Sequence, residues 1–517
     1  MNNTGAAVTR LAVIVAVLLA GTAGWGIAGY PGAAAGLLLG LLGGVLPWRG
    51  RRLWSWLALA VRRRRPLVLR APITVANDRA GGGVRYQDGV AAVAVQVLGR
   101  AHRPTLFTGS TATATENTID IGELGALLHQ SLGLTVDSLS VVSAGARRRS
   151  TGDYPRVYDT LIGTPPYAGR REVWIIARIA TLSNIDAMRC RASAGTTALA
   201  AAQRIGAALR QQGIRAKVAT ATDIVEMERR LGVSGLRPVN RRWRSVRADT
   251  GWLTSYGYAP EAVSSDSLAQ AWALRVDGVV QNVTLFPDGT ATATLTVRSA
   301  QPPAAPPSVL LQPLPGEQAL AVAANLCGPL PRLAAVRRGR VPATLAVAAG
   351  PSGVLLGKVG AGNRLLLPLD DPADFSRVHI IADDALAKRI VVRLAGSGER
   401  LTVHTRDTAR WDSVRMPQIV VSDAARPAPG TTVSVIDGTV TPAPRPNTVI
   451  SVGEPDTPQH RAADVRIRQT GPATLEVRAA GRVHIVEVEL FRAENRYLAA
   501  QPVAAALSPT ADLESVD

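Results

Sequence analysis

The sequence contains little cysteine, lysine or aromatic side chain. Only Cys190 and Cys327 are cysteines, and 4% of the 517 residues are aromatic. Two thiols so far apart argue against a disulfide framework and fit a reducing compartment. Three of the 58 basic residues are lysine, so 55 are arginine, which is typical of a GC-rich genome. The net charge of +19 is therefore not by itself evidence for a nucleic-acid partner.

Acidic residues are absent from the first 70 positions, and charge of either sign is absent from Leu11 to Trp48. A continuous helix over this apolar run would be roughly 57 Å long, about twice the thickness of the hydrocarbon core of a bilayer. The chain offers a break at Gly29-Tyr30-Pro31-Gly32. The run therefore predicts a two-helix transmembrane hairpin, with spans at Leu11–Ala28 and Gly32–Trp48.

Small residues recur at every fourth position of both predicted spans. This spacing keeps them on nearly one helix face, and small faces let helices approach closely in lipid. Chance matches are expected in a chain rich in alanine and glycine, but four glycines in register favour helix contacts, within the hairpin or with partners. The predicted packing residues are Ala12, Ala16, Ala20, Gly24, Ala28, Gly32, Gly36, Gly40 and Gly44.

A cleaved signal peptide is the alternative interpretation of this N-terminus. Arg10 followed by an apolar stretch fits that pattern. The stretch, however, continues past any small-residue cleavage site near Ala20 to Ala28, which favours a retained anchor.

Arginines flank the predicted hairpin on both sides. Basic residues near span ends stay in the cytoplasm, so we expect a two-pass protein of the inner (plasma) membrane whose termini and soluble domains are cytoplasmic. The segment from Leu53 to Val61 is too short to span, and its tryptophans suit the headgroup level. We expect anionic lipid, rather than nucleic acid, as the partner of the adjacent arginines. The predicted membrane-surface residues are Arg49, Arg51, Arg52, Trp54, Trp56, Arg62, Arg63, Arg64 and Arg65.

The rest of the chain is long enough for more than one domain. Gln301 to Gly316 is rich in proline, and such a run favours neither helix nor sheet. The predicted fold class is α+β, with a mixed α/β first soluble domain and a β-rich second one. The predicted units are the anchor and its arginine-rich segment (1–65), the first domain (66–300), a linker (301–316), the second domain (317–500) and a flexible tail (501–517).

Hydrophobic patterning predicts the individual elements. A capping box at Asp223 and Glu226 predicts a helix running to Leu231, and Pro287-Asp288-Gly289 predicts a hairpin turn. The first region is expected to hold strands at 90–97, 138–142, 171–179 and 214–219 and helices at 121–132 and 197–211. The second is expected to hold a helix at 317–326 and strands at 345–349, 353–359, 389–394, 419–422, 431–436, 475–477 and 484–491.

No phosphate-binding loop is indicated. The run Gly353 to Lys358 resembles part of one, but Ser352 replaces the required glycine and Val359 replaces the hydroxyl that would hold Mg²⁺. We interpret it as a strand or tight turn. Gly81-Gly82-Gly83 precedes a strand instead of joining one to a helix, and we interpret it as a flexible turn.

Metal-binding and catalytic patterns are also not indicated. The six histidines are scattered, and none has the spacing of a zinc site. Acidic residues gather around His379, among turn-forming and helix-start positions where capping and solvation explain them better than metal or acid–base chemistry. These residues are Asp370, Asp371, Asp374, Asp383 and Asp384. We therefore assign no catalytic residue, no cofactor and no metal.

The order of several segments resembles the EccE family of type VII (ESX) secretion systems. After the double span and its arginine-rich exit, the resemblance rests on five short stretches in order, with Trp243 before the last. They are Gly83-Val-Arg-Tyr-Gln-Asp-Gly89, Ser143-Ala-Gly-Ala-Arg147, Val157-Tyr-Asp-Thr-Leu-Ile-Gly163, Arg171-Glu-Val-Trp-Ile-Ile-Ala-Arg178 with the helix around Arg204, and Thr254-Ser-Tyr256. The resemblance spans residues 1 to about 300, and the region after 317 lies outside it.

The resemblance implies a scaffold at the edge of an inner-membrane complex with EccB, EccD and the ATPase EccC. It implies no catalytic residue. The alternative function is a membrane-tethered enzyme acting on nucleotide-sugars or cell-envelope precursors, with a site that no motif encodes.

Overall fold

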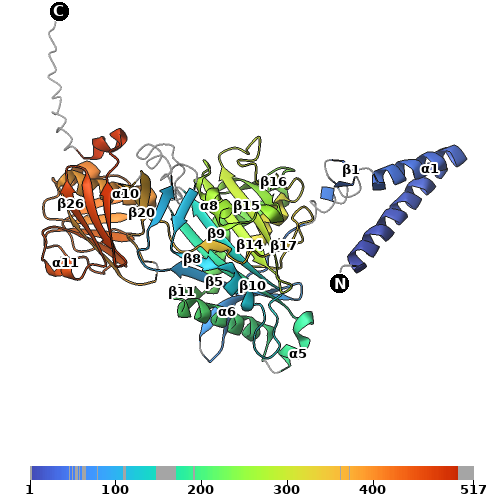
Figure 1. The fold of residues 1–517 in the computed structure, drawn as a ribbon, viewed down its shortest axis with the longest axis horizontal. Coiled ribbons are helices and arrows are strands. Elements are labelled where there is room, and N and C mark those ends of the chain that lie inside the picture. Colours follow the sequence, from blue (N-terminus) through green and yellow to red (C-terminus); the bar gives the residue numbers. More distant parts are fainter. Residues whose placement is uncertain are drawn as a thin grey trace, which may run out of the picture.

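The structure is a computed structural model, and Figure 1 shows its course. It describes residues 3–45, 47–48, 51–52, 56, 59–60, 66–78, 80–108, 112–146, 170–189, 192–360, 362–371 and 373–498. The predicted tail 501–517, most of the arginine-rich segment and the stretch from Val157 to Gly163 lie outside these residues.

The N-terminal apolar run forms helix α1 (Asn3–Val45), which is broken near its middle. Ala28 and Gly29 have non-helical backbone angles, and the φ of +62° at Gly29 is one that glycine adopts without strain. Pro31 follows two residues after Gly29, and it has no backbone N–H to donate to a helical hydrogen bond. Figure 1 shows the two helical segments meeting at this point. The predicted break is Gly29 to Gly32. The observed break includes Gly29 and the residue before it, Ala28.

The first large sheet is antiparallel throughout its described pairings. Its main order is β12-β13-β15-β14-β9-β10-β5-β4-β3, and β11, β16 and β17 pair at its sides. The strands are β3 (Ile73–Ala76), β4 (Gly81–Gln87), β5 (Val90–Gly99), β9 (Ser138–Ala146), β10 (Arg170–Ala180), β11 (Arg215–Val218), β12 (Val246–Ala248), β13 (Gly251–Tyr258), β14 (Gly278–Leu285), β15 (Thr290–Ser299), β16 (Leu311–Pro313) and β17 (Gly339–Arg340).

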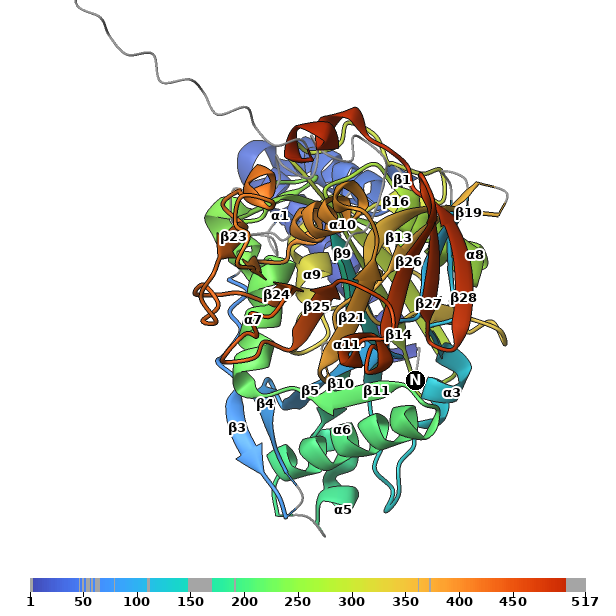
Figure 2. The ribbon, with the colours of Figure 1, turned by 90° about the vertical axis from the view of Figure 1, so that its left-hand side faces the viewer.

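Helices cover the first sheet on both faces. Helix α6 (Ala194–Gln211) begins at a capping box of Ser193 and Thr196 and packs Leu199 and Leu209 into the larger core. Helices α7 (Ala221–Leu231) and α9 (Gln318–Ala324) contribute to a second core against the opposite face. The shorter helices are α3 (Ile121–Ala126), α5 (Ile185–Met188) and α8 (Ser265–Gln270). Figure 2 shows α6 and α7 beside this sheet.

The second large sheet is partly parallel. Its order is β23-β22-β24-β25-β21-β26-β27-β28-β19-β20-β6-β7, with parallel pairing from β23 to β26 and antiparallel pairing beyond. Its strands are β6 (Thr105–Thr108), β7 (Ala112–Thr115), β19 (Val354–Val359), β20 (Asn363–Leu367), β21 (Ser376–Ile381), β22 (Leu401–His404), β23 (Ile419–Ser422), β24 (Val433–Asp437), β25 (Thr448–Val452), β26 (Val465–Gly471), β27 (Thr474–Ala479) and β28 (Arg482–Glu487).

The two sheets exchange segments across the predicted 301–316 linker. Strand β6, from the first region, pairs with β20 of the second sheet, and β7 pairs with β6 at the edge of that sheet. Strands β16 and β17, which follow residue 310, pair with the first sheet, and β18 (Ala346–Ala348) pairs with β8 (Thr118–Asp120). Proline content indicates irregular backbone but does not show which sheet the next segment joins. Residues 311–349 therefore lie with the first sheet.

The predicted strand at Arg389–Leu394 is wrong, because these residues lie in helix α10 (Asp384–Ser397). Asp383 caps the first turn of α10, and Gly398 ends it in a left-handed conformation. The helix is buried on nearly all sides. A fully buried helix has the same short apolar run as a buried strand, so periodicity could not separate the two.

Two smaller predictions also need correction. Gly81-Gly82-Gly83 is part of strand β4 and not a flexible turn. A Cβ on Gly83 would lie 2.6 Å from the backbone nitrogen of Ala221, so this glycine permits close contact with the start of α7. The residue that caps α7 is Thr220, and Asp223 is its capping-box partner three residues later.

Other predicted elements are confirmed. The strand predicted at 171–179 is β10, the helix at 197–211 lies within α6, and the helix at 317–326 corresponds to α9. The predicted hairpin joins β14 to β15, and Asp288 accepts a hydrogen bond from the backbone of Thr290 at its turn.

Candidate membrane anchor and its attachment

Helix α1 exposes apolar side chains outward and small residues inward. Among the described residues, Val17–Leu42 is the one helical segment long and apolar enough to cross a membrane. The side chains of Leu19, Ile27 and Leu39 are 63%, 87% and 68% exposed. Such apolar exposure marks a surface that meets lipid or protein.

The two segments of α1 touch through their backbones. A Cβ on Gly36 would overlap the carbonyl oxygen of Ala20, and Gly24 and Gly32 oppose each other in the same way. A Cβ on Gly40 would lie 3.0 Å from the Cα of Val17. Five of the nine predicted packing residues thus lie along this contact: Ala20, Gly24, Gly32, Gly36 and Gly40. The side chains of Ala12, Ala16 and Gly44 lie outside the described residues, and Ala28 is at the break.

The predicted membrane-surface residues are described only in part. Strands β1 (Pro47–Trp48) and β2 (Arg51–Arg52) form a short antiparallel pair. The ring centroid of Trp56 lies 5.6 Å from that of Trp243, and Leu59 is buried. Of the remaining predicted residues, Arg49, Trp54 and Arg62 to Arg65 lie outside the description.

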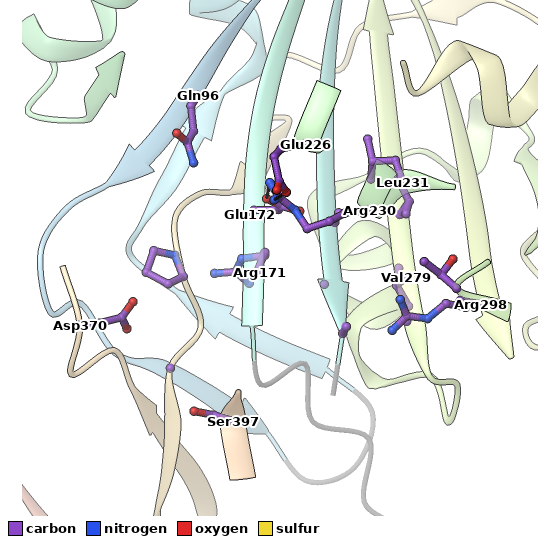
Figure 3. A pocket seen from close by; sticks show the side chains of 18 of the residues that line it. Gln96, Arg171, Glu172, Glu226, Arg230, Leu231, Val279, Arg298, Asp370 and Ser397 are labelled. Carbon is purple, nitrogen blue, oxygen red and sulfur yellow. Dashed lines mark hydrogen bonds and ion pairs between the residues drawn. The ribbon is translucent and has the colours of Figure 1, made fainter. Parts of the chain in front are cut away.

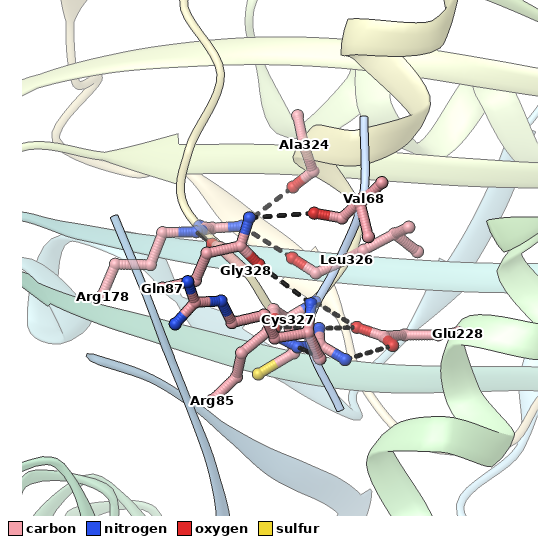
Figure 4. A network of polar contacts seen from close by, with 10 residues as sticks. Val68, Arg85, Gln87, Arg178, Glu228, Ala324, Leu326, Cys327 and Gly328 are labelled. Carbon is pink, nitrogen blue, oxygen red and sulfur yellow. Dashed lines mark hydrogen bonds and ion pairs between the residues drawn. The ribbon is translucent and has the colours of Figure 1, made fainter. Parts of the chain in front are cut away.

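The chain re-enters the described region as an extended strap, residues 66–70, held against strand β4. The side chain of Gln87 donates to the carbonyl of Val68 at 2.9 Å and accepts from the backbone nitrogen of Arg70 at 3.0 Å. The Nε of Arg85 donates to the carbonyl of Arg70. Leu67 and Leu69 pack against the core that contains α7 and α9. The strap thus fixes the chain leaving the anchor to the folded region. Figure 4 shows Val68 of the strap beside Gln87 and Arg85.

Arg85 joins the strap to a buried carboxylate. Its guanidinium forms a bidentate ion pair with Glu228 of α7, at 2.5 and 2.8 Å, and also donates to the carbonyl of Cys327. Glu228 accepts from the backbone nitrogen of Cys327 at 3.0 Å. Burial disfavours the charge on Arg85, but the hydrogen bond and charge of Glu228 outweigh it, so the pKa of Arg85 is raised.

Arg178 holds the chain that follows α9. It donates to the carbonyls of Ala324, Leu326 and Gly328 at 3.0, 3.1 and 2.6 Å, and to Ser140 at 2.6 Å. Burial lowers the pKa of Arg178 to about 10, so it remains charged at neutral pH. We call Arg85, Arg178 and Glu228, together with the chain that they hold, the first clamp. Burial raises the pKa of the Cys327 thiol within it to about 12, so this thiol is protonated.

Sequence patterns did not reveal this clamp. Arg85 and Arg178 lie within largely buried strands, and Glu228 lies on the buried face of α7 with Ile224, Met227 and Leu231. A charge inside an otherwise buried strand is the available signal, since such charges are buried only with partners.

A cleft of about 530 Å³ lies at the side of β9 and β10, between parts of both halves (Figure 3). Its wall carries charges of both signs: Arg230 pairs with Glu172 at 2.9 Å, while Asp370 and Ser397 come from the second half. Arg171, fully buried, donates to the carbonyl of Gly350 at 3.0 Å, and burial lowers its pKa to about 10. Arg171 therefore fixes the chain where the two halves join.

The residues that the sequence offered as possible phosphate-binding, metal-binding or acid–base groups have structural partners. Lys358 lies in β19 and pairs with Glu489 at 3.6 Å, and His379 contacts Ser451 at 2.7 Å. Asp383 caps α10, while Asp384 pairs with Arg410. No group of three or more potential metal ligands occurs among the described residues.

Comparison with known proteins places these features in a family. A family model described as "Putative type VII ESX secretion system translocon, EccE" matches residues 167–258. The chain is 49% identical to the ESX-2 secretion system protein EccE2 of Mycobacterium tuberculosis (strain CDC 1551 / Oshkosh), over 96% of each chain. It is 26% identical to the ESX-1 secretion system protein EccE1 of Mycobacterium tuberculosis (strain ATCC 25618 / H37Rv), over 71% of this chain and 75% of that relative.

These matches first define the class of protein: the chain is related to subunits of type VII ESX secretion systems. Its exposed apolar N-terminal helix is the candidate membrane segment. The chain belongs to the EccE family, as the near-full-length match shows. The match to the ESX-2 protein also includes most of residues 317–517, which the sequence resemblance had left outside.

Proposed function

We propose that this chain is a structural subunit of an inner-membrane type VII secretion complex that supports the assembly and stability of the export machinery. The observation that carries the proposal is the match along 96% of a protein named as an ESX-2 secretion component. The described residues also offer structural roles for the charged groups that were candidates for chemistry.

We further propose that α1 crosses the bilayer twice. The break at Ala28 and Gly29 and the backbone contact of Gly36 with Ala20 support two spans packed face to face. The first 70 residues contain nine arginines and no acid, which supports a cytoplasmic location for both termini and the folded region.

The proposed partners are the membrane subunits EccB, EccC and EccD, together with anionic lipid. The stronger match to the ESX-2 relative than to the ESX-1 relative supports an ESX-2-type system. The outward apolar residues of α1 would meet lipid tails or the spans of these subunits.

Affinity purification of the tagged full-length chain from detergent-solubilised membranes tests the proposal. We expect an ATPase and other membrane subunits of one secretion system to co-elute in fixed ratio. A chain that elutes alone, after mild extraction that keeps other membrane complexes intact, contradicts it.

The charged cleft favours a second candidate, a membrane-tethered enzyme acting on nucleotide-sugars or envelope precursors. The cleft's volume and its charges of both signs would suit a polar small molecule. Native mass spectrometry of the purified chain decides between the two: a retained nucleotide-sugar supports the enzyme, and a ligand-free chain supports the scaffold.

A further inference from the structure

An acid-free, arginine-rich stretch occurs in the folded region, far from the anchor in sequence. Residues 229–248 contain seven arginines and no aspartate or glutamate, and the next acid is Asp249. They run from the end of α7 to the end of β12. Such a stretch produces a strongly positive local field.

Three of these arginines face solvent without an acidic partner in the described part of the chain, whereas Arg229 and Arg230 pair with acids and Arg241 is buried. Arg237, Arg242 and Arg244 are exposed, and none of the three forms an ion pair among the residues that the structure describes. Val239 lies between them and is 73% exposed. We call the exposed residues Arg237, Val239, Arg242, Arg244 and Arg247 the arginine surface. Its mixture of unpaired cations and an exposed apolar side chain is unusual for a face that meets only water.

The arginine surface lies beside the chain that leaves the anchor. Trp243, which lies between Arg242 and Arg244 in the sequence, contacts Trp56, with 5.6 Å between ring centroids. The backbone oxygen of Trp243 accepts a hydrogen bond from Gly316 at 2.7 Å. Gly316 follows β16, which Figure 1 shows on the side of the first sheet toward α1.

The strap independently places the same surface near the membrane. Leu236 and Val246, which lie next to Arg237 and Arg247 of the arginine surface, belong to the core against which Leu67 and Leu69 pack. Pro66 follows Ala60 by six residues, which span at most about 20 Å. The first clamp allows the strap little freedom to move away from this core.

We propose that the arginine surface lies against the headgroups of an anionic bilayer, so that the folded region rests on the membrane instead of hanging from a free tether. Guanidinium groups bind phosphate oxygens in bidentate fashion, and tryptophan settles at the headgroup level. Each charge at such a surface strengthens binding roughly fivefold, so three exposed arginines strengthen it about a hundredfold. This inference rests on the proposed membrane anchoring.

Amide hydrogen–deuterium exchange of the full-length chain in lipid nanodiscs tests the inference. One set of discs contains phosphatidylcholine alone, and the other contains phosphatidylcholine mixed with phosphatidylglycerol. We expect exchange in residues 237–247 to slow by about tenfold in the anionic discs at low salt, and the slowing to disappear at high salt, which screens the charges. Equal exchange in both discs overturns the inference.

A matched pair of variants separates a local effect from a change in total charge. The triple variant Arg237→Gln, Arg242→Gln, Arg244→Gln should lose the lipid dependence. The control triple variant Arg406→Gln, Arg426→Gln, Arg445→Gln removes the same charge from exposed positions in the second half and should keep it. Lipid dependence that survives in the first variant, or is lost in the control, contradicts the inference.

The same samples distinguish failure of the proposed membrane-facing surface from failure of the proposed membrane anchoring. Both variants should stay in the discs through a high-salt wash, because α1 is unchanged. A wild-type chain that washes off contradicts the anchoring itself. A chain that stays while residues 237–247 exchange freely contradicts only the membrane-facing surface.

Discussion

Both halves of the folded region use buried arginines to hold a distant segment of chain, but the two arrangements differ. In the first clamp, Glu228 pairs with Arg85 and also accepts the backbone nitrogen of Cys327. In the second half, Glu494 is fully buried between Arg389 and Arg393 of α10, at 2.5 and 2.6 Å. We call these three residues the second clamp.

The segments held by the two clamps differ in what they connect. The first clamp holds the strap that comes from the membrane anchor, and with it the chain after α9. The second clamp holds the chain after β28 near the C-terminal end of the described region, where Arg393 also donates to the carbonyl of Glu489. The first clamp therefore fixes the chain between α1 and the folded region, whereas the second stabilises its own half.

Glu494→Gln should have the largest effect on stability. The substitution leaves two buried guanidinium groups without a carboxylate, and loss of one partner of a buried ion pair costs about 3–5 kcal/mol. Chemical denaturation of the purified chain, followed by exchange in the second sheet, measures this effect. The control is Glu476→Gln, which removes a surface ion pair with Arg478 and should cost at most about 1 kcal/mol. Similar losses for both variants would show that the second clamp is not a buried ion-pair network.

Glu228→Gln should weaken the first half by about 3 kcal/mol and also loosen the strap. Arg85 loses its anionic partner, so its hold on the carbonyl of Arg70 weakens. Limited proteolysis should then cut near residues 66–70 faster than in the Glu494→Gln variant. If both variants are cut there equally, the first clamp has no particular link to the membrane side.

Gly36→Leu should weaken the contact between the two segments of α1 by about 1–2 kcal/mol, because its side chain would meet the backbone of Ala20. Co-purification of partner subunits should fall while membrane insertion persists. Gly26→Leu is the matched control, since nothing lies within 4 Å of a Cβ at that position. Undiminished co-purification of the Gly36→Leu variant would contradict a packed hairpin. Gly40→Leu should act in the same direction, because Gly40 faces Val17.

Cys327 should report opening of the first clamp with little effect on stability at neutral pH. Its thiol pKa is raised from 9.0 to about 12 by burial. The unfolded thiol therefore ionises first, and the contribution of this group to stability is intact below pH 9 and declines as pH rises from 9 toward 12. In a Cys190→Ser background, thiol labelling should require unfolding of the first half. Fast labelling of the native chain would contradict the burial.

Elements formed by local chemistry were predictable from sequence. The hairpin at Asp288 has its own turn residues, and β10 is a long β-branched run. Helix α10 was not predictable from sequence, because burial on all sides removes the amphipathic signal that separates a helix from a strand. The exchange of β6 into the second sheet, with β7 paired to it, also depends on a pairing partner, β20, more than 200 positions away.

The candidate site also has parts that the sequence predicts and parts that it does not. The register of Gly32, Gly36 and Gly40 is visible in the sequence, because a four-residue period is a local property. The arginine run at 237–247 is also visible in the sequence, but its contact with Trp56 is not. The clamps depend on which distant segments meet in space. Glu228 and Arg85 are 143 positions apart, and no local pattern joins them.

The most direct test of the account is the side of the membrane on which the folded region lies. External protease added to intact spheroplasts should leave the chain beyond residue 66 undigested, while the same protease should degrade it in inverted membrane vesicles. Digestion in intact spheroplasts, with a known cytoplasmic protein still protected, would reverse the orientation and contradict both the anchor and its proposed partners.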